Sequence, residues 1–126
     1  MSEADRIWNR AAMEGGGCNP SSGDRALAAL LNAHGLVMNG GVLHAVELLH
    51  PTELSAAESG YREFSLDAVV KLLEKARTAF EANEHLDSWE SQLDSEYTKL
   101  IPDDSFLFSR FEEWFHLNPG DFSPLS

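Results

Sequence analysis

Apolar residues recur at steps of three and four positions along almost the whole chain, which is the spacing of one face of an α-helix. No stretch of four or more residues alternates cleanly between apolar and polar side chains, as a half-buried β-strand would. The pattern therefore predicts an all-α fold. The strongest periodicity covers residues 66–82, where Ser65 is placed to cap the start of a helix. We expect this helix to form the centre of the core through Leu66, Val69, Val70, Leu73, Ala76 and Phe80.

The remaining apolar stripes predict further helices separated by short turns. They cover residues 4–14, 24–33, 42–49, 52–62, 86–100 and 107–115. Gly15-Gly16-Gly17 is expected to end the first of these helices, and His34-Gly35 the second. Asn39, in an Asn39-Gly40-Gly41 turn, is placed to cap the helix that follows it. Because short connections favour antiparallel neighbours, the sequence predicts one domain over residues 1–126, a single compact bundle of about six or seven helices.

Aromatic residues are concentrated near the end of the chain and are expected in the core or in a dimer interface. Trp114, Phe115 and Phe122 provide more aromatic surface than one small core readily uses, which suggests a homodimer. The residues expected to be buried together are Val69, Leu73, Phe80, Trp89, Leu93, Phe111 and Phe115.

Charge is the least ordinary property of the composition. The 126 residues include 21 Asp and Glu against 9 Lys and Arg, which gives a net charge of −12. Such an excess argues against direct binding to nucleic acid or to anionic membranes, and it favours a basic protein partner. The excess is concentrated in residues 81–121, which hold eleven acidic residues and only two basic ones, Lys99 and Arg110, for a net charge of −9.

Acidic residues in this segment recur at helical spacing. Glu84, Asp87, Glu90 and Asp94 step by three, three and four positions, which places them along one side of a helix, away from its apolar stripe. Like charges at this spacing cost a few tenths of a kcal/mol per pair, so the row either keeps the protein soluble or contacts a partner. The residues predicted to bind a basic partner are Glu84, Asp87, Glu90, Asp94, Asp103, Asp104, Glu112 and Glu113.

Catalytic signatures are absent from the sequence, which has no phosphate loop with Lys after Gly, no Gly-x-Ser-x-Gly elbow and no dinucleotide fingerprint. Asp103 and Asp104 could pair as catalytic carboxylates, but side chains in a Pro-Asp-Asp turn are usually hydrated, and we expect them to cap the last helix. His44, Glu47 and His50 are spaced like metal ligands on a helix, but each step of three rotates the side chain by about 60° and a proline follows directly. We therefore expect no catalytic residue, no metal and no cofactor.

Cys18 is the single cysteine, so the chain can form no internal disulfide and offers no cysteine-based zinc site. The first residues lack the basic segment and apolar run of a signal peptide. The longest stretch without Asp, Glu, Lys or Arg, residues 26–46, is interrupted by polar residues and glycines. The sequence therefore predicts a cytoplasmic protein without a membrane span.

Several short motifs together resemble one known family. They are Ile7-Trp8, Asn39-Gly40-Gly41, Leu93-Asp94-Ser95-Glu96-Tyr97, Pro102-Asp103-Asp104 and the run Phe111-Glu112-Glu113-Trp114-Phe115-His116-Leu117-Asn118-Pro119-Gly120-Asp121-Phe122. Over nearly the whole chain the sequence resembles the DNA-mimic-protein family of small acidic bacterial domains, most of whose members have no known function. This resemblance implies an all-helical, non-enzymatic protein, often a homodimer, whose acidic face imitates duplex DNA on the DNA-binding surface of a basic partner such as a transcription factor. The chain departs from the family pattern at Val42-Leu43-His44, where a bulkier aromatic segment is usual, and at residues 15–22, which look like an insertion.

One acidic helix carries less charge than duplex DNA of the same length. Residues 84–96 contain five acidic residues and span about 20 Å if helical, whereas duplex DNA carries roughly 12 phosphate charges over that distance. DNA mimicry would therefore need Asp103, Asp104, Glu112 and Glu113 to extend the surface, and a second protomer could extend it further. Two alternatives remain open: an immunity or antitoxin-type protein that neutralises a basic toxin, and a metal-dependent enzyme that uses His44 and Glu47.

Overall fold

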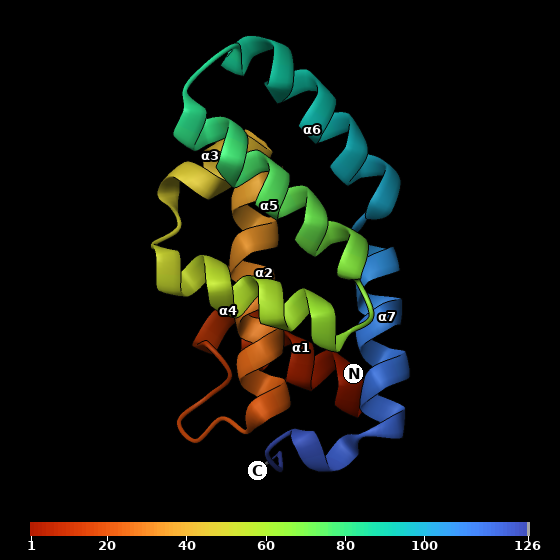
Figure 1. The fold of residues 1–126 in the computed structure, drawn as a ribbon. Helices are drawn as coiled ribbons and strands as arrows, with labels where there is room; N and C mark the ends of the chain where they lie inside the picture. Colours follow the sequence, from red (N-terminus) through yellow and green to blue (C-terminus); the bar gives the residue numbers. More distant parts are fainter. Residues whose placement is uncertain (126) are drawn as a thin grey trace.

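Seven α-helices and a closing 3₁₀ turn form the fold of residues 1–125, the part of the chain that the structure, a computed structural model, describes (Figure 1). The elements are α1 (Glu3–Glu14), α2 (Ser22–Gly40), α3 (Val42–Leu48), α4 (Pro51–Glu63), α5 (Asp67–Ala82), α6 (Leu86–Leu100), α7 (Asp104–Leu117) and η1 (Pro119–Asp121). No strand occurs within residues 1–125, which confirms the predicted all-α fold. None of these helices is long and apolar enough to cross a membrane.

The longest helix, α2, runs through the middle of the molecule and packs against α1, α3 and α4 (Figure 1). Helix α5 packs against α3, α4 and α6, and α7 packs against α1 and η1. All seven helices, together with Phe122, contribute buried apolar side chains to one core cluster. Of the predicted core, Val69, Leu73, Leu93, Phe111 and Phe115 are buried, but Phe80 and Trp89 are only half-buried.

Helix α2 continues past the His34-Gly35 pair at which the sequence predicted its end. That prediction was wrong because Gly35 keeps helical geometry here, while His34 and Val37 are buried and so extend the packed face of α2 by another turn. The helix ends instead before Gly41, whose φ of 97° is open to glycine and strained for other residues. Asn39 therefore lies inside α2 and does not cap α3, contrary to the prediction.

Local sequence signals predict the end of α1 correctly but not the start of α5. Gly15, Gly16 and Gly17 all have positive φ angles and end α1, as predicted. Ser65 was predicted to cap α5 but has a φ of 63°, and the capping position belongs to Leu66, which makes no side-chain capping bond. The tight turn from α4 into α5, closed by a bond from the Leu66 amide to the Tyr61 carbonyl, takes Ser65 out of capping geometry.

A buried ion pair fixes the beginning and the end of the chain against α2. The Asp24 carboxylate is fully buried and accepts hydrogen bonds from Arg10 Nη2 at 2.7 Å and from the backbone amides of Ser21 at 3.0 Å and Ser123 at 2.8 Å. Arg10 Nη2 also donates to the Ser123 carbonyl at 2.9 Å. These bonds distribute the buried negative charge over three donors, and they hold α1 and the C-terminal segment together at one end of the molecule (Figure 1).

The closest approach of two helices lies where Gly60 of α4 meets Ala26 of α2. A Cβ atom at Gly60 would collide with the carbonyl oxygen of Ala26, which belongs to the backbone and cannot turn away. We therefore predict that Gly60→Ala lowers the free energy of unfolding by about 1–3 kcal/mol, measured by urea denaturation. The matched control is Gly35→Ala in α2, where a Cβ atom meets open space and alanine should stabilise the helix by about 0.5–1 kcal/mol. Equal effects of the two substitutions would contradict this packing.

Candidate functional site

A chain of polar side chains runs from the surface into the core. His34 Nε2 lies 2.7 Å from Asp104 Oδ1, and His34 Nδ1 lies 2.8 Å from the Tyr97 hydroxyl. The Tyr97 hydroxyl lies 2.7 Å from that of Tyr61. The ring of His34 and both tyrosines are buried, whereas the Asp104 side chain is 75% exposed. The chain thus joins α2, α4, α6 and the first residue of α7 through four side chains.

The chemistry of these groups sets the direction of the hydrogen bonds. An ionised carboxylate only accepts hydrogen bonds, so Nε2 of His34 carries the proton and donates a hydrogen bond to Asp104. Burial raises the pKa of Tyr97 and of Tyr61, and both hydroxyls therefore keep their protons. In the neutral ring Nδ1 accepts from Tyr97, which in turn accepts from Tyr61. Every polar atom of this chain within the core is thereby satisfied.

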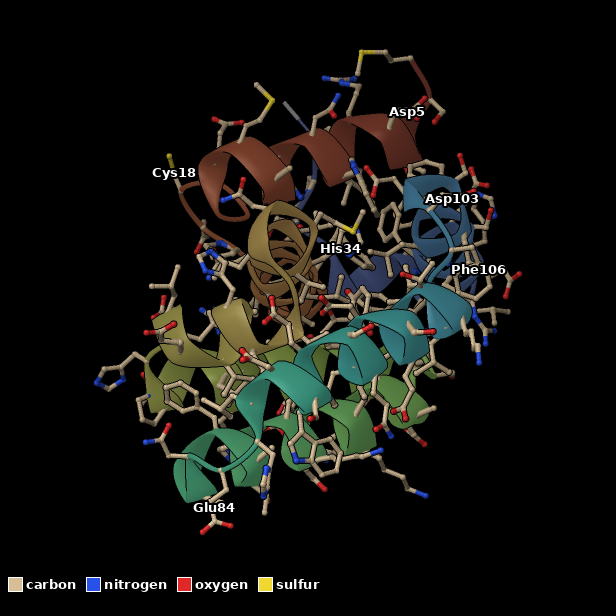
Figure 2. The ribbon with its side chains drawn as sticks, turned by 90° about the horizontal axis from the view of Figure 1, so that it is seen from above. Asp5, Cys18, His34, Glu84, Asp103 and Phe106 are labelled. Atoms are coloured by element: carbon tan, nitrogen blue, oxygen red, sulfur yellow. The ribbon has the colours of Figure 1, made fainter. Side chains whose placement is uncertain are left out.

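A groove of about 580 Å³ opens beside the surface end of this chain. Its walls come from α1 and α2, and Asp104 stands at its edge at the start of α7. In Figure 2, His34 lies toward the middle of the molecule, and Asp103, at the start of α7, lies nearer the edge of the molecule. The lining residues are Trp8, Ala11, Ala12, Gly15, Leu31, Asn32, His34, Gly35, Leu36 and Asp104.

The acidic row predicted along one helix is split in the structure. Asp87 and Glu90 are exposed on α6, but Glu84 lies before this helix begins, at its exposed N-terminal end (Figure 2). Asp94 is half-buried, and its Oδ1 accepts a hydrogen bond from the amide of Val42 at 2.8 Å. The predicted position of Asp94 on the outer side of the helix was therefore wrong: its carboxylate caps α3, the role that the sequence gave to Asn39.

The predicted acidic residues of the last helix also have separate roles. Asp103 Oδ1 accepts from the amide of Phe106 at 2.8 Å, which confirms the predicted cap of α7. Asp104 instead binds His34, a contact that the sequence analysis missed. Glu112 is half-buried and Glu113 is exposed on the same helix. No local signal could have linked Asp104 to His34, because 70 positions separate them and each lies at what looked like a helix end.

The histidines considered as metal ligands are not gathered into a site. His50 caps α4 by accepting a hydrogen bond from the amide of Thr52. The His44 ring packs against Gly40, and its buried Nε2 atom has no hydrogen-bond partner within residues 1–125. In that part of the chain no group of three or more His, Cys, Asp or Glu side chains could hold a metal ion. Cys18 is exposed in the loop between α1 and α2.

A family model described as DMP19-like protein matches residues 19–125, which is all of the described chain except residues 1–18, the segment that contains α1. The chain belongs to the DMP19-like protein family. The comparisons with curated proteins and with solved structures found no match. The matched segment of this DMP19-like protein contains His34, Tyr61, Tyr97 and Asp104, whereas the α1 side of the groove lies before it.

The buried hydroxyls of this DMP19-like protein give a stability prediction. Tyr97→Phe removes the hydroxyl that bonds to both His34 and Tyr61, and leaves two buried polar groups without a partner. We expect the free energy of unfolding to fall by about 2–4 kcal/mol, measured by urea denaturation. Tyr61→Phe is the matched control, because it removes a hydroxyl at the end of the chain and leaves Tyr97 bonded to His34, and we expect a loss of about 1 kcal/mol. If Tyr61→Phe lowered the free energy of unfolding as much as Tyr97→Phe, this would contradict the order of the hydrogen bonds, in which Tyr97 lies between Tyr61 and His34.

Proposed function

We propose that this DMP19-like protein is a non-enzymatic binding protein whose acidic surface occupies the DNA-binding surface of a basic protein, such as a transcription factor. The observation that carries the proposal is the concentration of charge on the part of the surface formed by α6, α7 and the turn before each helix. Residues 81–121 have a net charge of −9. The family match agrees with a DNA-mimic type of protein.

The exposed acidic side chains favour contact with a partner over a purely structural role. Asp87 and Glu90 on α6 and Glu113 on α7 are exposed, and no salt bridge within residues 1–125 involves them. Exposed carboxylates of this kind attract a basic surface over long range and increase the association rate more than the affinity. Asp94 contributes charge to this surface while it caps α3.

A second copy of the chain would lengthen the charged surface. The aromatic surplus that suggested a homodimer is smaller than the sequence indicated, because Phe115 and Phe122 are buried in the core and Trp114 is half-buried. The homodimer therefore rests on the family resemblance and on the length of the acidic surface, since one α6 helix carries fewer charges than duplex DNA of the same length. Sedimentation equilibrium measures this association directly.

The histidine and tyrosines of the site do not favour catalysis. Both ring nitrogens of His34 are hydrogen-bonded, so the ring has no free lone pair to act as a general base. Burial raises the pKa of both tyrosines, which opposes formation of a nucleophilic phenolate. Their hydrogen bonds to one another are those of a structural network.

The proposal predicts that DNA competes with this protein for its basic partner. The immobilised protein should capture a DNA-binding protein from a lysate of the source organism, and the operator DNA of that protein should release it. Asp87→Lys/Glu90→Lys should weaken binding by about tenfold or more at low salt and by less at high salt, because these residues act through long-range attraction.

Glu47→Lys/Glu74→Lys is the matched control, since it changes the net charge equally at exposed positions on α3 and α5. It should weaken binding much less than the α6 variant. If the protein captured a basic toxin and DNA did not displace that toxin, the result would contradict DNA mimicry and support the immunity function. Equal loss of binding in both variants would show that net charge acts without a defined surface.

A further inference from the structure

The groove beside Asp104 combines a fixed negative charge with an aromatic wall. Oδ1 of Asp104 accepts from His34, whose side chain is only 7% exposed and is held in the core, so this bond orients the carboxylate. Within residues 1–125 the other oxygen, Oδ2, has no hydrogen-bond donor. The side chain is 75% exposed, and this second oxygen is available to a ligand. The groove is thus prepared to accept a hydrogen-bond donor.

The other walls favour a flat cation over a neutral group. Trp8 lines the groove and packs against α7, with its ring centroid 5.3 Å from that of Phe108 and 5.9 Å from that of Phe111. An indole ring attracts cations to its face. Gly15 lies at the C-terminal end of α1, where the helix dipole is negative and the last turn holds no basic side chain. Asn32 adds an amide that can accept a hydrogen bond.

The positive end of one helix dipole also lies nearby, because Asp104 is the first residue of α7. That end is equivalent to roughly half a positive charge. Asp103 and Asp104 bring two carboxylates to the same turn, so the local charge stays negative. The site is therefore electrostatically suited to a cation.

We propose that this groove binds the guanidinium group of an arginine side chain on the surface of the basic partner. The inference rests on the proposed function and names the residue of the partner that anchors it. The guanidinium group donates to Asp104 Oδ2, and its plane stacks on Trp8. Arginine fits better than lysine because its planar fork can bond to the carboxylate and stack on an aromatic face at the same time.

A pair of neighbouring variants isolates the charge of the groove. Asp104→Asn removes the charge but keeps an oxygen that accepts the hydrogen bond from His34, so the hydrogen bonds that lead from this residue into the core persist. Asp103→Asn removes the same charge one residue away and keeps the helix cap, because asparagine caps as well as aspartate. The two proteins have equal net charge, and they differ only in the carboxylate that lines the groove.

Binding can be measured without the partner by NMR of the three tryptophan indole N–H groups. The probe is the peptide acetyl-Gly-Arg-Gly-amide, with acetyl-Gly-Lys-Gly-amide as its matched control. We expect the arginine peptide to shift the Trp8 signal, assigned by Trp8→Phe, while the signals of Trp89 and Trp114 stay in place. The lysine peptide should bind several-fold more weakly, and Asp104→Asn should weaken arginine binding by about tenfold, while Asp103→Asn leaves it within about twofold. Equal shifts with both peptides, or unchanged binding to Asp104→Asn, would overturn the proposal.

The same variants separate this inference from the proposed function. If Asp104→Asn and Asp103→Asn bind the captured basic protein equally well, while Asp87→Lys/Glu90→Lys binds it weakly, the result contradicts the arginine site in the groove. The proposed binding of a basic partner by the acidic surface is then still supported. If the arginine peptide binds the groove but DNA releases no captured protein, the groove is a cation site and the proposed DNA mimicry is wrong.

Discussion

The hydrogen bond between His34 and Tyr97 connects the central helix α2 to the acidic helix α6 and lies in the middle of the polar network that links α2, α4, α6 and α7. Helix α6 fully buries only Leu93 and Tyr97, while Trp89 and Leu100 pack half-buried against the core, so polar bonds contribute to its attachment as well. Three polar bonds attach α6 to its neighbours: the Tyr97 hydroxyl bonds to His34, Asp94 caps α3, and Lys75 of α5 bonds to Glu96 at 3.0 Å. The lysine hydrogen bond lowers the pKa of Glu96, and this carboxylate therefore stays charged.

This attachment explains how a helix with so many like charges keeps its place. The repulsion between exposed carboxylates on one helix costs a few tenths of a kcal/mol per pair, which is less than one well-made buried hydrogen bond contributes. The acidic residues of the α6 surface thus divide into two kinds. Asp94 and Glu96 bind the neighbouring elements, and Asp87 and Glu90 are exposed to solvent. On α7 the division is not complete: Asp103 caps the helix and Glu113 is exposed, but Asp104 bonds to His34 of α2 and also lines the groove.

Sequence reasoning recovered the helices because their apolar periodicity is local, and it located the stop at Gly15-Gly16-Gly17 for the same reason. It failed where a distant partner decides. The sequence predicted a helix end at His34, but its ring bonds to Tyr97 and Asp104, which lie 63 and 70 positions away, and the helix continues. The acidic segment was recognised from composition, but the capping role of Asp94 depends on Val42, which lies 52 positions earlier.

The proposed contact of this surface with a basic partner can be tested by the deuterium uptake of backbone amides, in the free protein and in its complex with the captured basic protein. The groove and the exposed carboxylates together predict slower uptake in three segments: the end of α1, the first turns of α6 and the start of α7. Slower uptake confined to α3 and α4, with those three segments unchanged, would contradict both the acidic surface and the groove as the place of contact.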